Sequence, residues 1–313
     1  MDTEISSKVN GLMAAVKYYS DPLVCISEVA AVKWPKGEAV CPRCEGKEHF
    51  WLSTRLMWKC KACKKQFSVK VGTIFEDSPV GLDKWLCAMW MIANCKNGVS
   101  SYEIARALEV TQKTAWFMDH RIRYAMHHGT INKMSGTVEA DETFIGGKAR
   151  NMHASKREQK IKGRGPMGKE IVFGLLDHET GKVHTKHVST RRKKDLQPII
   201  REVVEPGSEL HTDALESYAG LDEYTHKIVD HAEAYVQDNV HTNRMENFWS
   251  LLKRTIKGTY VSIEPFHLFR YLDEQSFRYN ERHATDAERF HKVLGSVAGK
   301  RLTWNTLTSQ EVG

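Results

Sequence analysis

A glutamate and a lysine seven residues apart, Glu246 and Lys253, are the first candidates for chemistry in this chain. Apolar residues recur at helical spacing through 243–256, which predicts an α-helix there. On such a helix the two charged residues project from one face, about 10 Å apart. A carboxylate and a cation in this arrangement suit a metal ion held beside a phosphate. Taken alone, the pattern also fits a solvated helix with scattered charges.

Two aspartates upstream favour the chemical interpretation. Asp141 lies in the alternating segment 137–145, which predicts a strand, and Asp213 ends a second short strand. The predicted order is strand, hairpin, helix, strand, strand, helix. An RNase H-like α/β fold, a mixed sheet with flanking helices, has this order and brings the two strand ends and the last helix together. The predicted elements are 137–145, 171–177, 182–188, 193–205, 209–213, 225–230 and 243–256.

These acids predict a magnesium site. Asp141, Asp213 and Glu246 can hold two Mg²⁺ (or Mn²⁺) ions about 4 Å apart, because hard divalent cations prefer oxygen ligands. One ion would activate an attacking water or 3′-hydroxyl, and the other would stabilise the leaving oxygen. Asn243, one turn before Glu246, is the alternative third ligand. Glu139 and Glu142 are interpreted as surface acids, with support of Asp141 as the alternative.

Four of the seven cysteines predict a separate metal site. Cys41-x2-Cys44 and Cys60-x2-Cys63 are two short knuckles separated by fifteen residues with strand-like apolar runs. This spacing is typical of a zinc ribbon with one structural Zn²⁺, since four thiolates leave no open coordination position. Two disulfides or a redox pair are the alternatives.

Basic residues in several segments predict contacts with DNA. A capping box at Ser100 begins a helix over 102–108, and a turn at 109–111 leads into a second helix over 112–126. This is the pattern of a helix-turn-helix, with an ordinary helical hairpin as the alternative. The segment 148–164, with seven basic residues and one acid, is expected to be a loop that grips phosphates. The candidate DNA contacts are Lys113, Arg121, Arg123, Lys148, Arg164, Arg254 and Lys257.

Length and composition place these features in an ordinary globular protein. The 313 residues carry a net charge of +7, which fits a polyanionic partner such as double-stranded DNA. The absence of a long apolar run and of a secretory signal predicts a cytoplasmic, nucleoid-associated protein without a membrane partner. The predicted parts are a helical segment (1–36), a zinc ribbon (37–72), a helix-turn-helix region (80–130), a catalytic domain (136–290) and a tail (291–313).

Several strings resemble one family, the bacterial insertion-sequence transposases with an N-terminal zinc ribbon, an ISXO-like group related to the eukaryotic Merlin elements. The resemblance covers nearly the whole chain. It lies in Val138–Gly147, His211–Asp213, His241–Trp249, Lys253-Arg254, Gly258–Tyr260, Arg270–Leu272 and Phe277–Asn280. It implies a DDE transposase with Asp141, Asp213 and Glu246 as metal ligands and Lys253 touching DNA near the scissile phosphate. The 32 residues between Asp213 and Glu246 match the spacing typical of DDE enzymes.

The resemblance also implies an activity. Such a Mg-dependent DNA transposase binds the terminal inverted repeats of its element, cleaves a strand with two metal ions and transfers the 3′-hydroxyl into target DNA, as a dimer or larger assembly on DNA. A non-catalytic zinc-ribbon/helix-turn-helix DNA-binding protein, a regulator or a domesticated transposase, is the alternative, and a nuclease without strand transfer is a third. Intact acids at all three positions favour the transposase.

Overall fold

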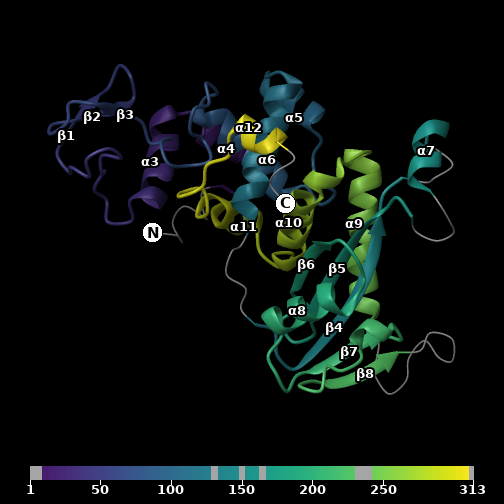
Figure 1. Ribbon diagram of the computed structural model, residues 1–313. Coiled ribbons are helices and arrows are strands. Elements are labelled where there is room, and N and C mark those ends of the chain that lie inside the picture. Colours follow the sequence, from purple (N-terminus) through teal and green to yellow (C-terminus); the bar gives the residue numbers. More distant parts are fainter. Residues whose placement is uncertain (1–8, 128–132, 148–151, 162–166, 230–241, 310–313) are drawn as a thin grey trace. The chain divides into compact units, whose positions relative to one another are not determined.

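The computed structural model describes residues 9–127, 133–147, 152–161, 167–229 and 242–309. The chain divides into two compact units, one of residues 1–127 with 283–313 and one of residues 128–282, called unit 1 and unit 2 below (Figure 1). Among the helices in the described ranges, none has the length and apolar character needed to cross a bilayer.

A five-stranded mixed sheet is the centre of unit 2, with strand order β6-β5-β4-β7-β8 (Figure 1). The central strand β4 pairs antiparallel with β5 and parallel with β7, and β8 continues parallel to β7. Because β4 and β7 run parallel, their carboxyl-terminal ends point to the same edge of the sheet. The bounds are β4 Thr137–Ile145, β5 Glu170–Asp177, β6 Val183–Val188, β7 Glu209–Asp213 and β8 Thr225–Val229.

Helices cover both faces of this sheet, and alternation along the strands decides which residues face which helix. Val138 and Ala140 of β4 pack with α8 (Lys193–Val203) in one apolar cluster. Ile145 of the same strand packs with α9 (Asn243–Thr255) and α10 (Leu268–Asn280) in a second cluster. A mixed sheet between helices confirms the expected RNase H-like α/β fold.

Some elements of unit 2 differ from those predicted. A short helix, α7 (Ala154–Lys160), lies in the segment expected to be a loop. The helix α9 is followed by a π-helical turn over Ile256–Tyr260, and a 3-10 turn over Pro265–His267 precedes α10. Unit 2 ends at Arg282, whereas the predicted catalytic range continues to 290.

The C-terminal residues pack in unit 1 instead. Phe290 of α11 (Asp286–Leu294) lies with its ring centroid 5.3 Å from that of Trp90 on α4 (Leu82–Asn94). Beyond α11, Val297, Leu302 and Leu307 are also buried, so the range expected to be a tail contributes to a core. The last helix is α12 (Trp304–Thr308).

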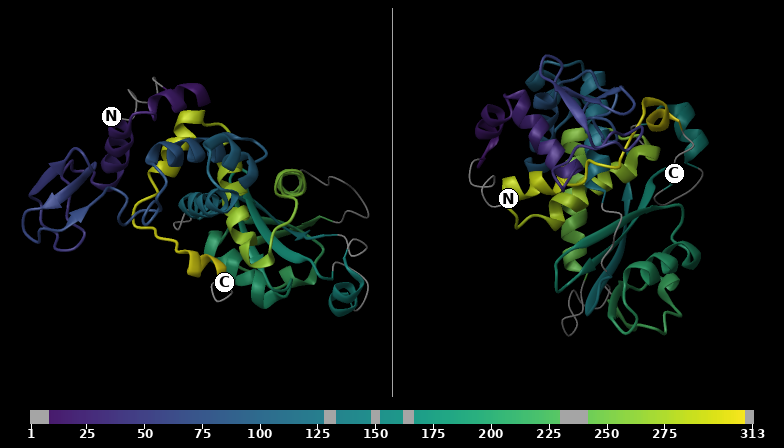
Figure 2. Two further views of the ribbon diagram at one scale, coloured as in Figure 1. Left: turned by 90° about the horizontal axis from the view of Figure 1, so that it is seen from above. Right: turned by 90° about the vertical axis from the view of Figure 1, so that its left-hand side faces the viewer.

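The predicted pair of helices in unit 1 is present as α5 (Ser101–Leu108) and α6 (Gln112–Met126), in contact with each other and with α4. Both halves of the capping box at Ser100 are formed. Glu109 closes α5 with φ of 50°, the left-handed conformation that glycine usually supplies at this position. Unit 1 also contains α2 (Leu12–Tyr18), α3 (Pro22–Lys33) and a small antiparallel sheet of β1 (His49–Leu52), β2 (Met57–Cys60) and β3 (Gln66–Phe67) (Figure 2).

Candidate active site

Three carboxylates gather beside the middle of β4 and the end of β7. One oxygen from each of Asp141, Glu142 and Asp213 lies within 4.8 Å of the others, close enough for a shared metal ion. The parallel pairing of the two strands stops at Glu139 and His211, two residues before the aspartates. Beyond that pair, no ladder hydrogen bonds join the two strands, so β4 and β7 can separate and leave space between them for the acids. The structure therefore brings together Asp141 and Asp213 and adds Glu142.

The electrostatics of this group favour a bound cation. Burial, together with the smaller effect of the negative charge of Asp213, raises the pKa of Asp141 to about 6. Burial also raises the pKa of Glu142 to about 7. Carboxylates held together in a half-buried site repel one another when ionised, so the site must bind protons or a cation. All the donors are hard oxygens, which fits a divalent ion such as Mg²⁺ or Mn²⁺.

Each of the three acids is oriented by a hydrogen bond. The indole Nε1 of Trp249 donates to Asp141 Oδ2 at 2.9 Å. The backbone N–H of Leu215 donates to Asp213 Oδ1 at 3.0 Å. The Tyr218 hydroxyl donates to Glu142, and this bond lowers the pKa of Glu142 against the larger effect of burial. Asp141 Oδ1 also accepts from the backbone N–H of Glu142 at 2.8 Å, so each Asp141 oxygen accepts one bond and keeps a lone pair for a metal.

Glu246 and Lys253 of α9 lie beside Asp141. Glu246 is exposed and is not part of the 4.8 Å group, but its charge contributes to the raised pKa of Asp141. Burial lowers the pKa of Lys253, and the negative charge of Asp141 acts in the opposite direction. The alternative ligand Asn243 is exposed in the first turn of the same helix.

The interpretation of Glu139 and Glu142 as surface acids is wrong. Glu139 has no exposed area and Glu142 is half-buried against Tyr218. Glu139 instead accepts hydrogen bonds from the backbone of α9 and from His178. Alternation along the strand gave a usable signal for Glu139, since it shares the face of Asp141. Alternation gave no such signal for Glu142, because the residue after Asp141 points to the opposite face of the strand.

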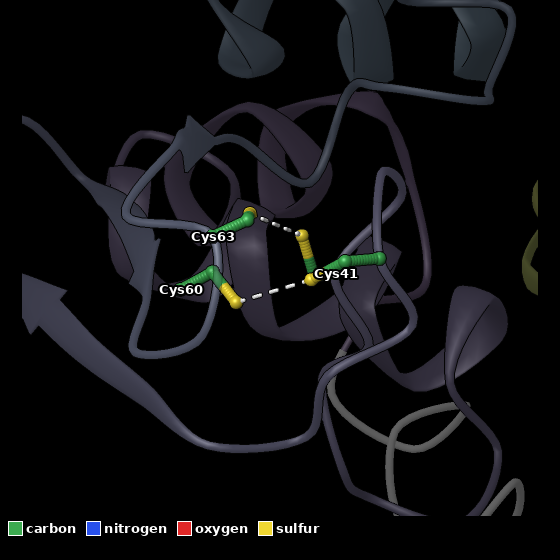
Figure 3. A group of neighbouring side chains, drawn as sticks. Cys41, Cys60 and Cys63 are labelled. Atoms are coloured by element: carbon green, nitrogen blue, oxygen red, sulfur yellow. Dashed lines mark hydrogen bonds between the residues drawn. The ribbon is translucent and has the colours of Figure 1, made fainter.

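The four patterned cysteines form the second candidate metal site. Their Sγ atoms all lie within 4.8 Å of one another, with Cys41 3.7 Å from Cys63 and Cys44 3.6 Å from Cys60. Figure 3 shows the sulfurs of Cys41, Cys60 and Cys63 directed toward a common centre. All four thiols are free at separations far above an S–S bond length, which excludes the disulfide alternative in this structure.

The two knuckles have matching backbones. Glu45 and Lys64, each one residue after a knuckle, have φ of 57° and 61°. Their N–H groups donate to the carbonyls of Cys41 and Cys60. A hydrogen bond from the backbone of Arg43 lowers the pKa of Cys41 to about 7, toward the thiolate that a metal requires. Four converging thiols on two tight turns fit one tetrahedral Zn²⁺.

The predicted DNA contacts differ in their accessibility. Arg121 and Arg123 are 4% and 1% exposed, so the prediction that they contact DNA is wrong. The Arg121 guanidinium donates to backbone carbonyls of Leu302, Ile74 and Glu76, which makes it part of the core of unit 1.

The other candidate cations include three exposed ones. Lys113 is exposed, with its ammonium 4.5 Å from the ring centroid of Trp304. Arg254 and Lys257 are exposed on α9 and the π-helical turn after it. Lys148 and Arg164 lie outside the described residues.

Comparison with known proteins identifies both parts. Residues 133–280 match the family model of the ISXO2-like transposase domain, and residues 24–66 match that of the transposase zinc-ribbon domain. An uncharacterized protein in transposable element ISH50 of Halobacterium salinarum is 25% identical over 255 residues, 77% of this chain and 85% of the relative. An uncharacterized transposase-like protein of Haemophilus influenzae is 35% identical over 101 residues, 32% of this chain and 81% of the relative.

The matched ranges contain the three carboxylates of β4 and β7 and all four cysteines. The chain therefore belongs to the zinc-ribbon transposases with an ISXO2-like transposase domain.

Proposed function

We propose that this transposase binds the terminal inverted repeats of its insertion sequence, cleaves a DNA strand and joins the freed 3′-hydroxyl to target DNA. The observation that carries the proposal is the convergence of Asp141 and Asp213 from adjacent parallel strands, with Glu142 and the Glu246 charge beside them. Oxygen donors at this density suit a pair of Mg²⁺ or Mn²⁺ ions and a phosphodiester.

The chain's own residues would hold and orient the reacting groups. Asp141 and Asp213 would be ligands, with Glu246 as the third ligand and Glu142 as the competing candidate. When bound, divalent ions would neutralise charge on the scissile phosphate and activate the attacking hydroxyl. Lys253, beside Asp141 and half-buried, would contact the phosphate itself.

We propose that DNA contacts outside the acids come from basic residues in both units. We propose Arg254 and Lys257 as backbone contacts near the cleavage site, with Lys148 and Arg164 in the basic segment and Lys113 in unit 1. The zinc ribbon would hold one structural Zn²⁺ through Cys41, Cys44, Cys60 and Cys63. At least two chains would act together, because two element ends must be joined.

The test uses purified full-length protein, Mn²⁺ or Mg²⁺ and labelled inverted-repeat DNA. Wild-type protein should nick the DNA and join it to a target, and Asp141→Asn and Asp213→Asn should each abolish both steps while DNA binding persists. Asp222→Asn, which changes an exposed acid between Tyr218 and β8, is the matched control and should leave the activity intact. Binding without nicking, unaltered by Asp141→Asn, would refute the proposal and favour a non-catalytic DNA-binding protein.

The third ligand is decided by a second comparison. Glu246→Gln, Glu142→Gln and Asn243→Ala are assayed side by side for Mn²⁺ affinity and nicking. If Glu246 is the ligand, its substitution reduces both measurements strongly and the Asn243 substitution does not. A greater loss from Glu142→Gln would transfer that role to the carboxylate already within 4.8 Å of both aspartates.

A further inference from the structure

Helix α9, which carries Glu246 and Lys253, begins without a cap of its own. Thr242 is the N-cap residue, and its side chain makes no capping hydrogen bond to the first turn of the helix. The first N–H groups of an α-helix have no partner inside the helix and need one elsewhere. One of these, the N–H of Met245, donates to Glu139 Oε2 at 2.8 Å. The cap thus comes from β4, and its negative charge also suits the positive end of the helix dipole.

A second bond joins the same strand and helix one helical turn later. Trp249 Nε1 donates to Asp141 Oδ2 at 2.9 Å. The acceptors are two residues apart on one face of a strand, which is about 6.6 Å. The donors belong to residues four positions apart on a helix, whose backbones are separated by about 6.0 Å of rise. Because these repeats match, both bonds form together only when α9 runs along β4 in one register.

The neighbouring strand allows the helix to come this close. Gly174 of β5 lies opposite Asp141 in the ladder. A Cβ at this glycine would meet Cε of Met245 and would lie 2.7 Å from two ring atoms of Trp249. Only a residue without a side chain therefore leaves room for the two contacting residues of α9.

Glu139 is itself held from a third element. His178 Nε2, just after β5, donates to Glu139 Oε1 at 2.5 Å. The His178 carbonyl in turn accepts from Arg244 Nη1 at 2.9 Å, a second tie to the first turn of α9. Both oxygens of this fully buried carboxylate are thus engaged, one by the helix and one by the histidine.

We propose that Glu139 and Trp249 are positioning residues that set the register of α9 on β4 and thereby place Glu246 and Lys253 on either side of Asp141. We call the bonds Glu139–Met245 and Asp141–Trp249 the β4–α9 clasp. Trp249 precedes Lys253 by one turn and follows Glu246 by three residues, so a shift of α9 displaces both charges from Asp141. The proposal rests on the proposed function, because it concerns how that metal site is assembled.

The test compares Glu139→Gln with Glu139→Leu in the full chain. Glutamine keeps an oxygen that can accept from Met245, whereas leucine fills similar space with no acceptor. Glu209→Leu is the matched control, since it also removes a carboxylate 2.5 Å from a histidine, but its partners His211 and Lys227 lie on β7 and β8.

Two measurements report on the clasp: the Mn²⁺ affinity of the free protein and the indole N–H resonance of Trp249, the only tryptophan in residues 128–282. Glu139→Leu should weaken Mn²⁺ binding by roughly 10–100-fold, the range found for residues that orient metal ligands. It should also move the indole resonance, while Glu139→Gln and Glu209→Leu stay close to wild type. Equal effects of all three substitutions, or none, would overturn the proposal.

Two further arms keep the result decisive. If Glu139→Leu does not fold, Trp249→Phe removes the indole donor and keeps a smaller aromatic ring, and an unchanged Mn²⁺ affinity in that variant would overturn the clasp. If wild-type protein binds Mn²⁺ but never nicks DNA, the proposed function fails, while the affinity and the resonance still decide the positioning role.

Discussion

The close approach of α9 to the sheet at Gly174 gives a prediction with a calculable size. Substitution by alanine adds one methyl group. This group would meet Cε of Met245 and would lie 2.7 Å from two ring atoms of Trp249. The Met245 side chain is flexible enough to turn away. Trp249 is not, because it is 4% exposed and its indole is bonded to Asp141.

Two opposing terms decide the magnitude. Overpacking a well-filled core costs about 1–3 kcal/mol. Removing a glycine from the interior of a strand returns about 0.5–1 kcal/mol. The limits of these two terms give a net loss in the free energy of unfolding of about 0–2.5 kcal/mol, with a central value near 1 kcal/mol that lowers Tm by roughly 2–4 °C in a unit of this size.

The assay is calorimetry of the full chain, combined with the indole resonance of Trp249. Gly147→Ala is the matched control, because among the described residues, its chain neighbours aside, no heavy atom lies within 4 Å of its added Cβ. Gly174→Ala should lower the Tm of unit 2 and shift the indole resonance, and Gly147→Ala should do neither. If the two variants are equally stable and the resonance stays in place, the proposed tight contact between α9 and β5 is wrong.

Four other changes have expected outcomes. Burial raises the pKa of Asp141 to about 6 and that of Glu142 to about 7, so Mn²⁺ must displace protons at pH values below these pKa values. The Mn²⁺ affinity, measured by calorimetry, should therefore rise about tenfold per pH unit for each proton released and level off above about pH 8. Tyr218→Phe removes a bond that lowers the pKa of Glu142, so the same affinity profile should move to higher pH. Cys44→Ser should release zinc, measured by metal content, without changing Mn²⁺ affinity. Arg121→Ala should lower the Tm of unit 1 by removing a buried donor to three carbonyls, and DNA affinity that fell without a loss of stability would contradict that role.

Local patterns were sufficient to predict the elements that position the aspartates. The strand over 137–145, which carries Asp141, has the predicted bounds. In unit 1, the helix from 112 to 126 also has the predicted bounds. Alternation identifies a strand with one face toward each helical layer, and helical spacing identifies a buried stripe. Asp141 and Asp213 could be assigned to one site, because they lie on strands that a mixed sheet places side by side, although only Asp213 ends its strand and Asp141 lies in the middle of β4.

Long-range contacts explain what the patterns missed. Arg121 and Arg123 lie in the second helix of a helix-turn-helix pattern, where solvent exposure is the natural expectation. The C-terminal half of α6 is instead enclosed, since the Arg121 donors reach Leu302, 181 residues away, and Ile74. Local periodicity carries no information about a segment so far along the chain, so the burial of these cations could not be predicted.

The role of Glu139 illustrates a second limit. An acid next to the helix N-terminus that it caps is recognisable in a sequence, because capping boxes have a fixed spacing. Glu139 caps a helix that begins 104 residues later, and its bond to the Met245 amide spans 106 residues. The sequence before α9 shows one half of a capping box, because Thr242 is a residue type that caps helices but Met245, three residues later, stands where the box has glutamate or glutamine. A functional helix with a weak local start is thus a reason to look for its cap among unexplained buried acids elsewhere, and here that acid shares a strand face with a metal ligand.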